Sequence, residues 1–166
     1  MSAKQLTCNE TFASASHRIF LSDLNEHETV FGGRILSWVD DSASISCERA
    51  SRQVTVTASL DHINFIHPVV LQDGLDLQSY VTGAGHRSLE VFVKGVGEHL
   101  LTGEKFLAFS CFSTFVTLSK SPNPALPEIV PVTDEQKFIC AGYDERNAAR
   151  KAGRAVQKDL MDHLEL

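Results

Sequence analysis

The apolar positions of the chain are densest between residues 33 and 50. We predict an α-helix over this segment, which would be roughly 27 Å long at about 1.5 Å per residue. A helix this apolar cannot lie on a surface, so other elements must wrap around it. Its middle nevertheless carries Asp40 and Asp41, the only charged residues between Ile35 and Cys47. Neither acid has a Lys or Arg three or four positions away, so no ion pair along the helix neutralises them.

β-Strands are predicted on both sides of this helix, because segments rich in β-branched and aromatic residues alternate with glycine-containing turns. The predicted strands cover residues 11–21, 54–60, 75–82, 88–96 and 105–118. Consecutive strands with short turns form antiparallel sheets, and one long helix with about five strands is an α+β arrangement. We expect a strongly curved sheet around the helix, with Gly95 and Gly97 producing a bulge that helps it curve. The polar segment 22–29 is expected to be a loop that contributes to a site.

The composition changes after residue 120, where Pro122, Pro124, Pro127 and Pro131 lie close together. We divide the chain into a globular domain over residues 1–120 and a proline-rich linker with a polar helical tail over residues 121–166. A capping-box pattern, Thr133-Asp134-Glu135-Gln136, starts the tail helix.

One face of the tail helix is basic. The residues that recur on it are Arg146, Arg150, Arg154 and Lys158. This stripe is either a solvated helix face or a phosphate-binding arm. A further hypothesis is that the tail packs on a neighbouring subunit through Phe138, Ile139 and Tyr143 while the basic face stays solvated.

Composition limits the class of protein. The chain has 166 residues, of which 43% are hydrophobic, and a net charge of -6, which favours one acidic globular domain and argues against nucleic-acid binding. Four scattered cysteines without a Cys-x-x-Cys pattern indicate free thiols and no metal site. We found no signal-peptide pattern and no apolar run near the roughly 20 residues of a membrane span, so a cytoplasmic protein without membrane contact is expected.

Asp40 is the better candidate of the two helix acids for chemistry. It shares a helix face with Gly33, Leu36 and Ala43, small or apolar residues that suit a buried surface, whereas Asp41 lies on a different azimuth. A carboxylate against packed surface is open to tuning by desolvation and by its partners. The competing interpretation is that both acids are ordinary surface charges.

Three groups of residues together resemble the bacterial acyl-CoA thioester hydrolases of the hotdog fold, over residues 16–120. These groups are Asn25-x5-Phe31-Gly32-Gly33-x-Ile35-Leu36-x3-Asp40, then Thr57-Ala58-Ser59-x-Asp61-x3-Phe65-x2-Pro68-Val69, then Gly85-x-Arg87-Ser88-x-Glu90-Val91. The family fold is a curved antiparallel sheet around a central helix, which agrees with the pattern above. The resemblance implies hydrolysis of acyl-CoA to a fatty acid and coenzyme A, without metal or other cofactor.

The resemblance also implies roles for individual residues. Asp40 would be the catalytic carboxylate, as general base or as nucleophile, and Asn25 would position water or substrate in a site shared across a dimer interface. The helix N-terminus at Gly32 and Gly33 offers free amides that can hold the oxyanion of a thioester. Without the resemblance, an Asn after Asp23-Leu24 would be read as a turn residue.

Gly85, Arg87 and Ser88 offer backbone amides, a guanidinium and a hydroxyl that suit the phosphates or pantetheine of coenzyme A. The competing interpretation is a tight hairpin with an exposed Arg. His27 is a possible second catalyst and Asp61 a possible pocket residue, although a solvated His and a turn-capping Asp are the usual roles for such positions.

Two other functions are compatible with the same fold. A hydratase or dehydratase would need a His on the central helix, and residues 33–50 contain none. A non-catalytic acyl-CoA binding or sensing module remains open. The expected assembly is a homodimer at minimum, because a single sheet leaves an edge strand exposed, and the family suggests a trimer of dimers. Cys47 and Cys111 lack a matched base and are not candidate nucleophiles.

Overall fold

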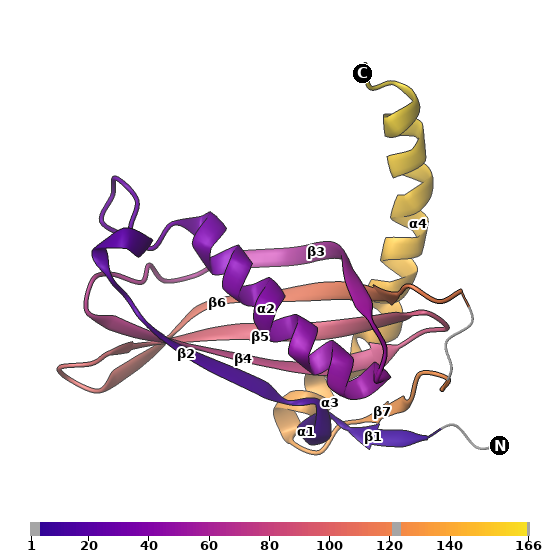
Figure 1. Ribbon diagram of the computed structural model, residues 1–166, viewed down its shortest axis with the longest axis horizontal. Helices are drawn as coiled ribbons and strands as arrows, with labels where there is room; N and C mark the ends of the chain where they lie inside the picture. Colours follow the sequence, from indigo (N-terminus) through magenta and orange to yellow (C-terminus); the bar gives the residue numbers. More distant parts are fainter. Residues whose placement is uncertain (1–3, 121–123, 166) are drawn as a thin grey trace.

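The computed structural model describes residues 4–120 and 124–165. Its main element is a five-stranded antiparallel sheet in the order β2-β4-β5-β6-β3. One long helix, α2 (Gly32–Ser51), crosses one face of this sheet and contacts all five strands (Figure 1). The strands are β2 (Ala13–Arg18), β3 (Thr55–Phe65), β4 (Asp73–Ala84), β5 (Ser88–His99) and β6 (Glu104–Thr117). The predicted α+β hotdog arrangement is confirmed.

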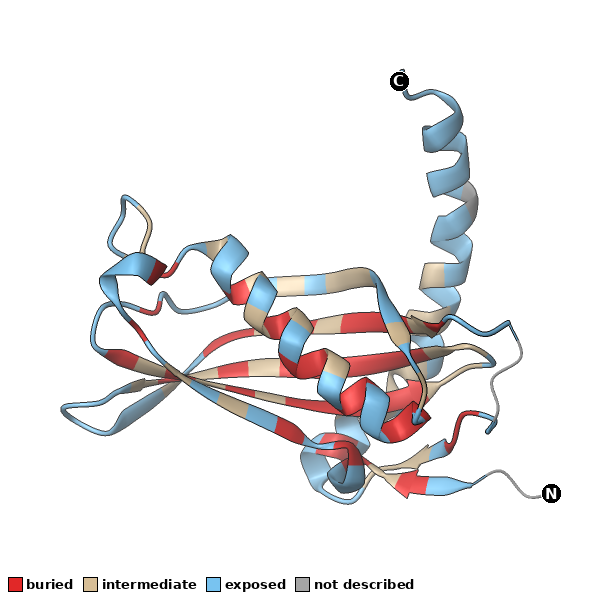
Figure 2. Cartoon of the chain, in the orientation of Figure 1, coloured by how far each residue is buried: buried red, intermediate tan, exposed pale blue. Residues whose placement is uncertain are grey.

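The inner face of α2 explains why the helix forms there. Its buried apolar residues recur every three or four positions and pack on the sheet, which Figure 2 shows as red patches along the helix. They are Ile35, Val39, Ala43, Cys47 and Ala50. Three buried hydroxyls link α2 to β4 by hydrogen bonds. The Oγ atoms of Ser42 and Ser46 lie 3.0 and 2.8 Å from the Ser79 Oγ. The helix ends at Arg52, which adopts a left-handed conformation.

The predicted bulge in β5 is present between Gly95 and Val96, where the register with β6 shifts. Gly95 and Gly97 lie directly under the rings of Phe109 and Phe106, so a Cβ atom at either glycine would collide with a ring. The two glycines therefore let the aromatic side chains of β6 lie flat on β5, and the shift lets the sheet bend.

Segments from the first and last parts of the chain pack together against β4. A short parallel pair joins β1 (Gln5–Thr7) to β7 (Glu128–Val130), and α1 (Cys8–Thr11) follows β1 directly. Helix α3 (Asp134–Ala141) and the first turns of α4 (Tyr143–Asp162) lie behind the sheet, and the rest of α4 projects away from it (Figure 1). Among the described residues, no helix has the length and apolarity needed to cross a membrane.

The N-terminal strand is shorter than predicted because other local contacts compete with it. A capping box between Thr7 and Glu10 starts α1, so β2 begins only at Ala13. At its other end the Asp23 carboxylate accepts the Phe20 N–H at 3.0 Å and organises the 3-10 helix η1 (Leu21–Asp23). The strand is thus limited to six residues.

The basic stripe of α4 divides into two halves. Arg146 and Arg150 are directed at the sheet and bind the fully buried carboxylate of Glu90 at 2.8 and 2.5 Å, and Thr82 donates to the same carboxylate at 2.6 Å. Arg154 and Lys158 are exposed. Both sequence interpretations of the stripe are therefore wrong for Arg146 and Arg150, because a buried acid on β5 holds them. They are neither solvated nor free to bind phosphate.

The apolar residues of the tail are placed differently within the single chain. The predicted capping box between Thr133 and Gln136 is confirmed. Ile139 packs on the outer face of the sheet, and Tyr143 lies over Gly83. Phe138 is 81% exposed, so its packing on a neighbouring subunit stays a prediction.

Candidate active site

The side chain of Asp40 lies at the middle of α2 and faces the edge strand β3. It is half-buried, and its Oδ1 accepts a hydrogen bond of 2.5 Å from the Thr57 hydroxyl. Asp41 is exposed, as its different azimuth predicts. A carboxylate that keeps one oxygen free while the other is held by a neutral donor is oriented for proton transfer or for attack on a carbonyl carbon.

Thr57 is the site residue that sequence reasoning missed, since it was read only as part of a motif on the strand. The pairing of β3 with β6 explains why the Thr57 side chain points toward α2. The register between β3 and β6 shifts between Thr57 and Ser59, which places Thr57 toward the helix and the next side chains elsewhere. One sequence signal could have identified it: a threonine on the strand that follows an apolar helix with an acid at its middle.

The N-terminus of α2 is a second polar feature. The residue before it, Phe31, supplies no side-chain acceptor, and the first turn carries no acid, so no side chain of these residues caps the first amides of the helix. Gly32 lines an adjacent cavity of about 350 Å³, together with Ile35, Phe65 and His67. Backbone amides beside an apolar cavity are suited to hold a developing oxyanion next to an acyl chain.

Asp40 and the helix N-terminus cannot act on one carbonyl within one chain. Gly32 and Asp40 are eight positions apart, which places their backbones about 12 Å apart along the helix axis. A base or nucleophile and its oxyanion donors must both lie about 3 Å from the reacting group. Within one chain, Asp40 and the first amides of α2 are therefore too far apart to contact the same reacting group.

Asn25 lies in the loop beside the helix N-terminus and closes that loop. Its Oδ1 accepts the N–H groups of His27 and Thr29 at 2.9 and 3.2 Å, and its Nδ2 donates to the Thr29 hydroxyl at 3.0 Å. Glu28, within the same loop, has a positive φ of 61°. Asn25 thus has the turn role that its sequence context suggests, and among the described residues no hydrogen bond joins it to Asp40.

His27 and Asp61 lie away from Asp40. The side chain of His27 is 78% exposed, and its Nε2 lies 3.5 Å from a carboxylate oxygen of Glu26. Asp61 accepts a hydrogen bond from Ser59 at 3.1 Å and lines a cavity of about 410 Å³ that is bounded on its other side by Arg150 of α4. That cavity lies on the face of the sheet opposite α2.

Gly85, Arg87 and Ser88 form the hairpin between β4 and β5. The Gly85 N–H donates to the Ser88 carbonyl at 2.7 Å, and Arg87 Nη2 donates to the Thr117 carbonyl at 2.9 Å. Arg87 is half-buried rather than fully exposed, and its Nε is a buried donor without a partner. The hairpin lies at the end of the sheet where α2 ends, opposite the helix N-terminus (Figure 1).

The remaining candidate chemistry is limited. Burial raises the pKa of Cys47 and of Cys111 to about 12, so both thiols are inert at neutral pH. Within residues 4–120 and 124–165, no three His, Cys, Asp or Glu side chains are grouped closely enough to hold a metal ion.

Comparison with known proteins places this geometry in a family. Residues 27–102 match the thioesterase superfamily. The chain is 46% identical over 158 residues to a Bacillus subtilis protein described as an uncharacterized acyl-CoA thioester hydrolase, with 95% of this chain and 92% of the relative covered.

Solved structures agree with the sequence comparison. An acyl-CoA hydrolase from Bacillus cereus superposes with a TM-score of 0.91 at 42% identity, covering 98% of this chain and 99% of that one. An acyl-CoA hydrolase from Staphylococcus aureus, solved with butyryl coenzyme A, coenzyme A and coenzyme A disulfide, superposes with a TM-score of 0.89 at 28% identity, covering 96% and 98%. The chain belongs to the acyl-CoA thioester hydrolases of the thioesterase superfamily.

Proposed function

We propose that this protein hydrolyses acyl-CoA thioesters to a carboxylic acid and coenzyme A. The observation that carries the proposal is the half-buried Asp40 carboxylate held by Thr57, on a helix whose free N-terminus opens on an apolar cavity. These are the two elements that acyl transfer to water requires, namely a base or nucleophile and oxyanion donors.

In the general-base form of the reaction, Asp40 removes a proton from water as the water oxygen attacks the thioester carbon. The amides at Gly32 and Gly33 stabilise the tetrahedral oxyanion. When the intermediate collapses, the carbon–sulfur bond breaks and the proton returns to the coenzyme A thiolate. In the nucleophilic form, an Asp40 oxygen attacks the thioester carbon, the carbon–sulfur bond breaks and coenzyme A leaves as a thiolate. Water then hydrolyses the mixed anhydride, which releases the carboxylic acid, regenerates the Asp40 carboxylate and supplies the proton that the thiolate takes up. Neither form uses a metal or a further cofactor.

The complete site is proposed to form between two subunits. The helix N-terminus and Asn25 come from one subunit and Asp40 with Thr57 from the other, because about 12 Å separates the two halves within a chain. Strand β3 is a sheet edge with exposed apolar side chains, including Val56 and Phe65, and a second copy would cover it. One related solved structure, 29% identical with a TM-score of 0.85, is described as a hexameric acyl-CoA thioesterase. We propose a homodimer as the minimal unit and a trimer of dimers as the full assembly.

The roles of three residues gain support from the Staphylococcus aureus hydrolase. Solved variants of that enzyme replace one Asp, one Thr and one Asn by alanine. The three replaced positions have the same spacing along its chain as Asp40, Thr57 and Asn25 have here. Asn25 is proposed to position water or the thioester where its loop contacts the partner subunit.

Coenzyme A is proposed to contact the hairpin of Gly85, Arg87 and Ser88, where the half-buried guanidinium of Arg87 supplies a positive charge beside backbone amides. His27 and Asp61 are left without a catalytic role. A cytoplasmic location is proposed, where acyl-CoA is formed and used.

A panel of acyl-CoA substrates of graded chain length tests the function, with release of free thiol as the readout. The proposal predicts turnover that depends on chain length and is lost in Asp40→Asn. Binding of acyl-CoA without thiol release at any chain length would instead identify a sensing module.

A further inference from the structure

Two of the four cysteines are in contact, although they are 132 positions apart in the sequence. The Sγ atoms of Cys8 and Cys140 lie 3.6 Å from each other. Cys8 belongs to α1 near the start of the chain, and Cys140 belongs to the last turn of α3. A disulfide has a sulfur–sulfur distance of about 2.05 Å, so a shift of roughly 1.5 Å would allow the bond to form.

The segments that carry the two thiols are held together by other contacts. Strand β1 pairs with β7, and the Gln136 Nε2 donates to the Asn9 Oδ1 at 2.8 Å, which ties α3 to α1 beside the cysteines. The thiols also share a small apolar cluster with Tyr80 and Phe92 on the outer face of the sheet. The approach of the two sulfur atoms is therefore a property of the packed fold and not of a mobile terminus.

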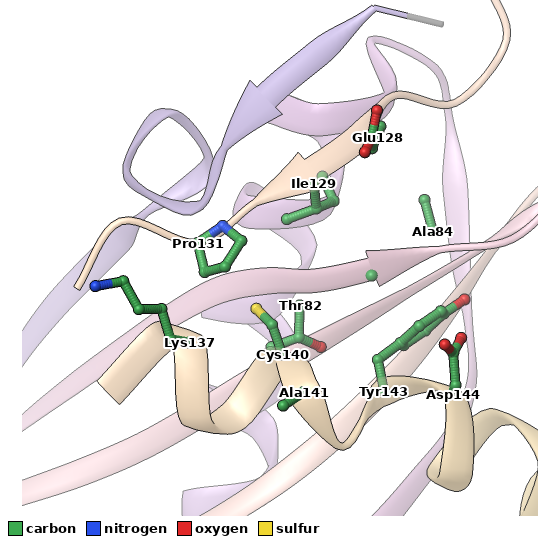
Figure 3. Close-up of a pocket in the computed structure, with 11 residues that line it drawn as sticks. Thr82, Ala84, Glu128, Ile129, Pro131, Lys137, Cys140, Ala141, Tyr143 and Asp144 are labelled. Carbon is green, nitrogen blue, oxygen red and sulfur yellow. The ribbon is translucent and has the colours of Figure 1, made fainter. Parts of the chain in front are cut away.

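The two thiols differ in access and in charge environment. Cys8 is fully buried, whereas Cys140 is half-buried and lines a cavity of about 480 Å³. Figure 3 shows its sulfur directed from α3 into that cavity, toward Pro131 and Thr82. A soluble reagent can thus reach Cys140 but not Cys8.

The environment favours the thiolate at Cys140. The hydrogen bond from Cys8 and, after it, the charge of Arg146 hold the pKa of Cys140 below its usual value, in spite of partial burial. The contact with Cys140 and burial raise the pKa of Cys8. Because the thiolate is the nucleophile in thiol–disulfide exchange, the accessible cysteine is also the reactive one.

We infer that Cys140 and Cys8 form a redox pair, in which Cys140 attacks a low-molecular-weight disulfide and Cys8 resolves the product. In the first step a bond forms between the Cys140 sulfur and one sulfur of the reagent, and the other half leaves as a thiolate. In the second step the Cys8 thiol loses its proton and attacks the Cys140 sulfur, which forms the internal disulfide and expels the second half. Two protein thiols are oxidised, and one soluble disulfide is reduced to two thiols that take up the protons.

The internal disulfide would join α1 to α3 and so fasten the C-terminal helices to the sheet. This inference does not depend on the proposed hydrolysis, since neither cysteine lies beside Asp40 or at the N-terminus of α2. It concerns a modification site on the opposite face of the molecule.

The test treats the native, reduced protein with bis(2-hydroxyethyl) disulfide, a small neutral reagent, and identifies the products by intact and peptide mass spectrometry. The wild-type protein should lose two hydrogens, with Cys8 and Cys140 in one cross-linked peptide, and dithiothreitol should restore the original mass. Since the bond closes a long loop, the oxidised protein should have a Tm higher by at least about 5 °C.

Variants separate the roles of the two thiols. Cys8→Ala should stop at a stable mixed disulfide on Cys140, and Cys140→Ala should leave Cys8 unmodified. Cys111→Ala, which removes another buried thiol, should behave as wild type. The inference is overturned if the native wild-type protein gives no cross-linked peptide, or if the reagent modifies Cys47 or Cys111 before Cys140. The wild-type measurement decides even if a variant fails to fold.

Discussion

Asp40 is a half-buried carboxylate on an apolar helix, and its Oδ1 accepts a hydrogen bond from the Thr57 hydroxyl. This position distinguishes it from Asp41, one residue further along, which is exposed. The contrast allows the two acids to serve as candidate and matched control in one experiment.

Asp40→Asn should lower kcat by about 10² to 10⁴, the usual range for loss of a general base, while the far-UV circular dichroism spectrum stays unchanged. Asp41→Asn removes the same charge from an exposed position and should keep nearly full kcat. Comparable losses in both variants would show that net charge, and not the Asp40 carboxylate, matters.

Thr57 tests whether the hydroxyl orients Asp40. A hydrogen bond to a charged group contributes about 1.5 to 3 kcal/mol, so Thr57→Val should reduce kcat by roughly 10- to 100-fold if the bond persists in the transition state. Thr57→Ser keeps the hydroxyl and should recover most of the activity. If serine is as damaging as valine, the methyl group rather than the hydroxyl is what the site needs.

At the level of elements, α4 is attached to the sheet by charge. Glu90 has no exposed side-chain surface, and the side chains of Arg146 and Arg150 are only 17% and 15% exposed. Breaking a buried pair by neutralising one partner leaves an uncompensated charge and typically costs about 3 to 5 kcal/mol.

Glu90→Gln is therefore expected to lower the Tm by roughly 6 to 20 °C, measured by calorimetry or circular dichroism. Arg154→Gln changes an exposed member of the same basic stripe and should shift stability by less than about 0.5 kcal/mol. An unchanged Tm in Glu90→Gln would mean that the Arg pairs do not stabilise the attachment of α4.

The elements that sequence predicts well are those with strong periodicity. The spacing of apolar residues located α2 to within a residue or so at each end, and the glycine turns located β4, β5 and β6. Contacts between distant elements have no such signal. The pairing of β1 with β7 joins three residues of each strand that are 123 positions apart in the sequence. The partner of Arg146 and Arg150 is Glu90 of β5, which only the packing of α4 on the sheet reveals.

The sequence likewise predicts some residues of the candidate site and not others. Asp40 is conspicuous as a charge inside an apolar run, whereas Thr57 is one of many threonines on strands and acquires its role from its position opposite the helix. The local context of Asn25 predicts only a turn residue, and its proposed role in a site shared by two subunits came from the family resemblance.

At the scale of the whole molecule, a single chain has an open sheet edge at β3, and its Asp40 lies far from the N-terminus of its own α2. Strand β3 presents Val56 and Phe65 at that edge, with 42% and 56% of each residue exposed. Covering the edge with a second copy would join the helix N-terminus of one subunit to Asp40 of the other. Sedimentation should accordingly find all activity in species no smaller than a dimer, and an active monomer at assay concentration would exclude the shared site.

The most direct test of the shared site mixes two damaged subunits. Asp40→Asn and Asn25→Ala are each purified, then unfolded and refolded together at equal amounts. If each site takes Asp40 from one subunit and Asn25 from the other, half of the sites in a mixed dimer are intact. Random pairing then restores about a quarter of wild-type kcat above the residual activity of the two variants refolded separately. No gain on co-refolding, with mixed dimers confirmed by native mass spectrometry, would show that Asp40 and Asn25 act within one chain or not together at all.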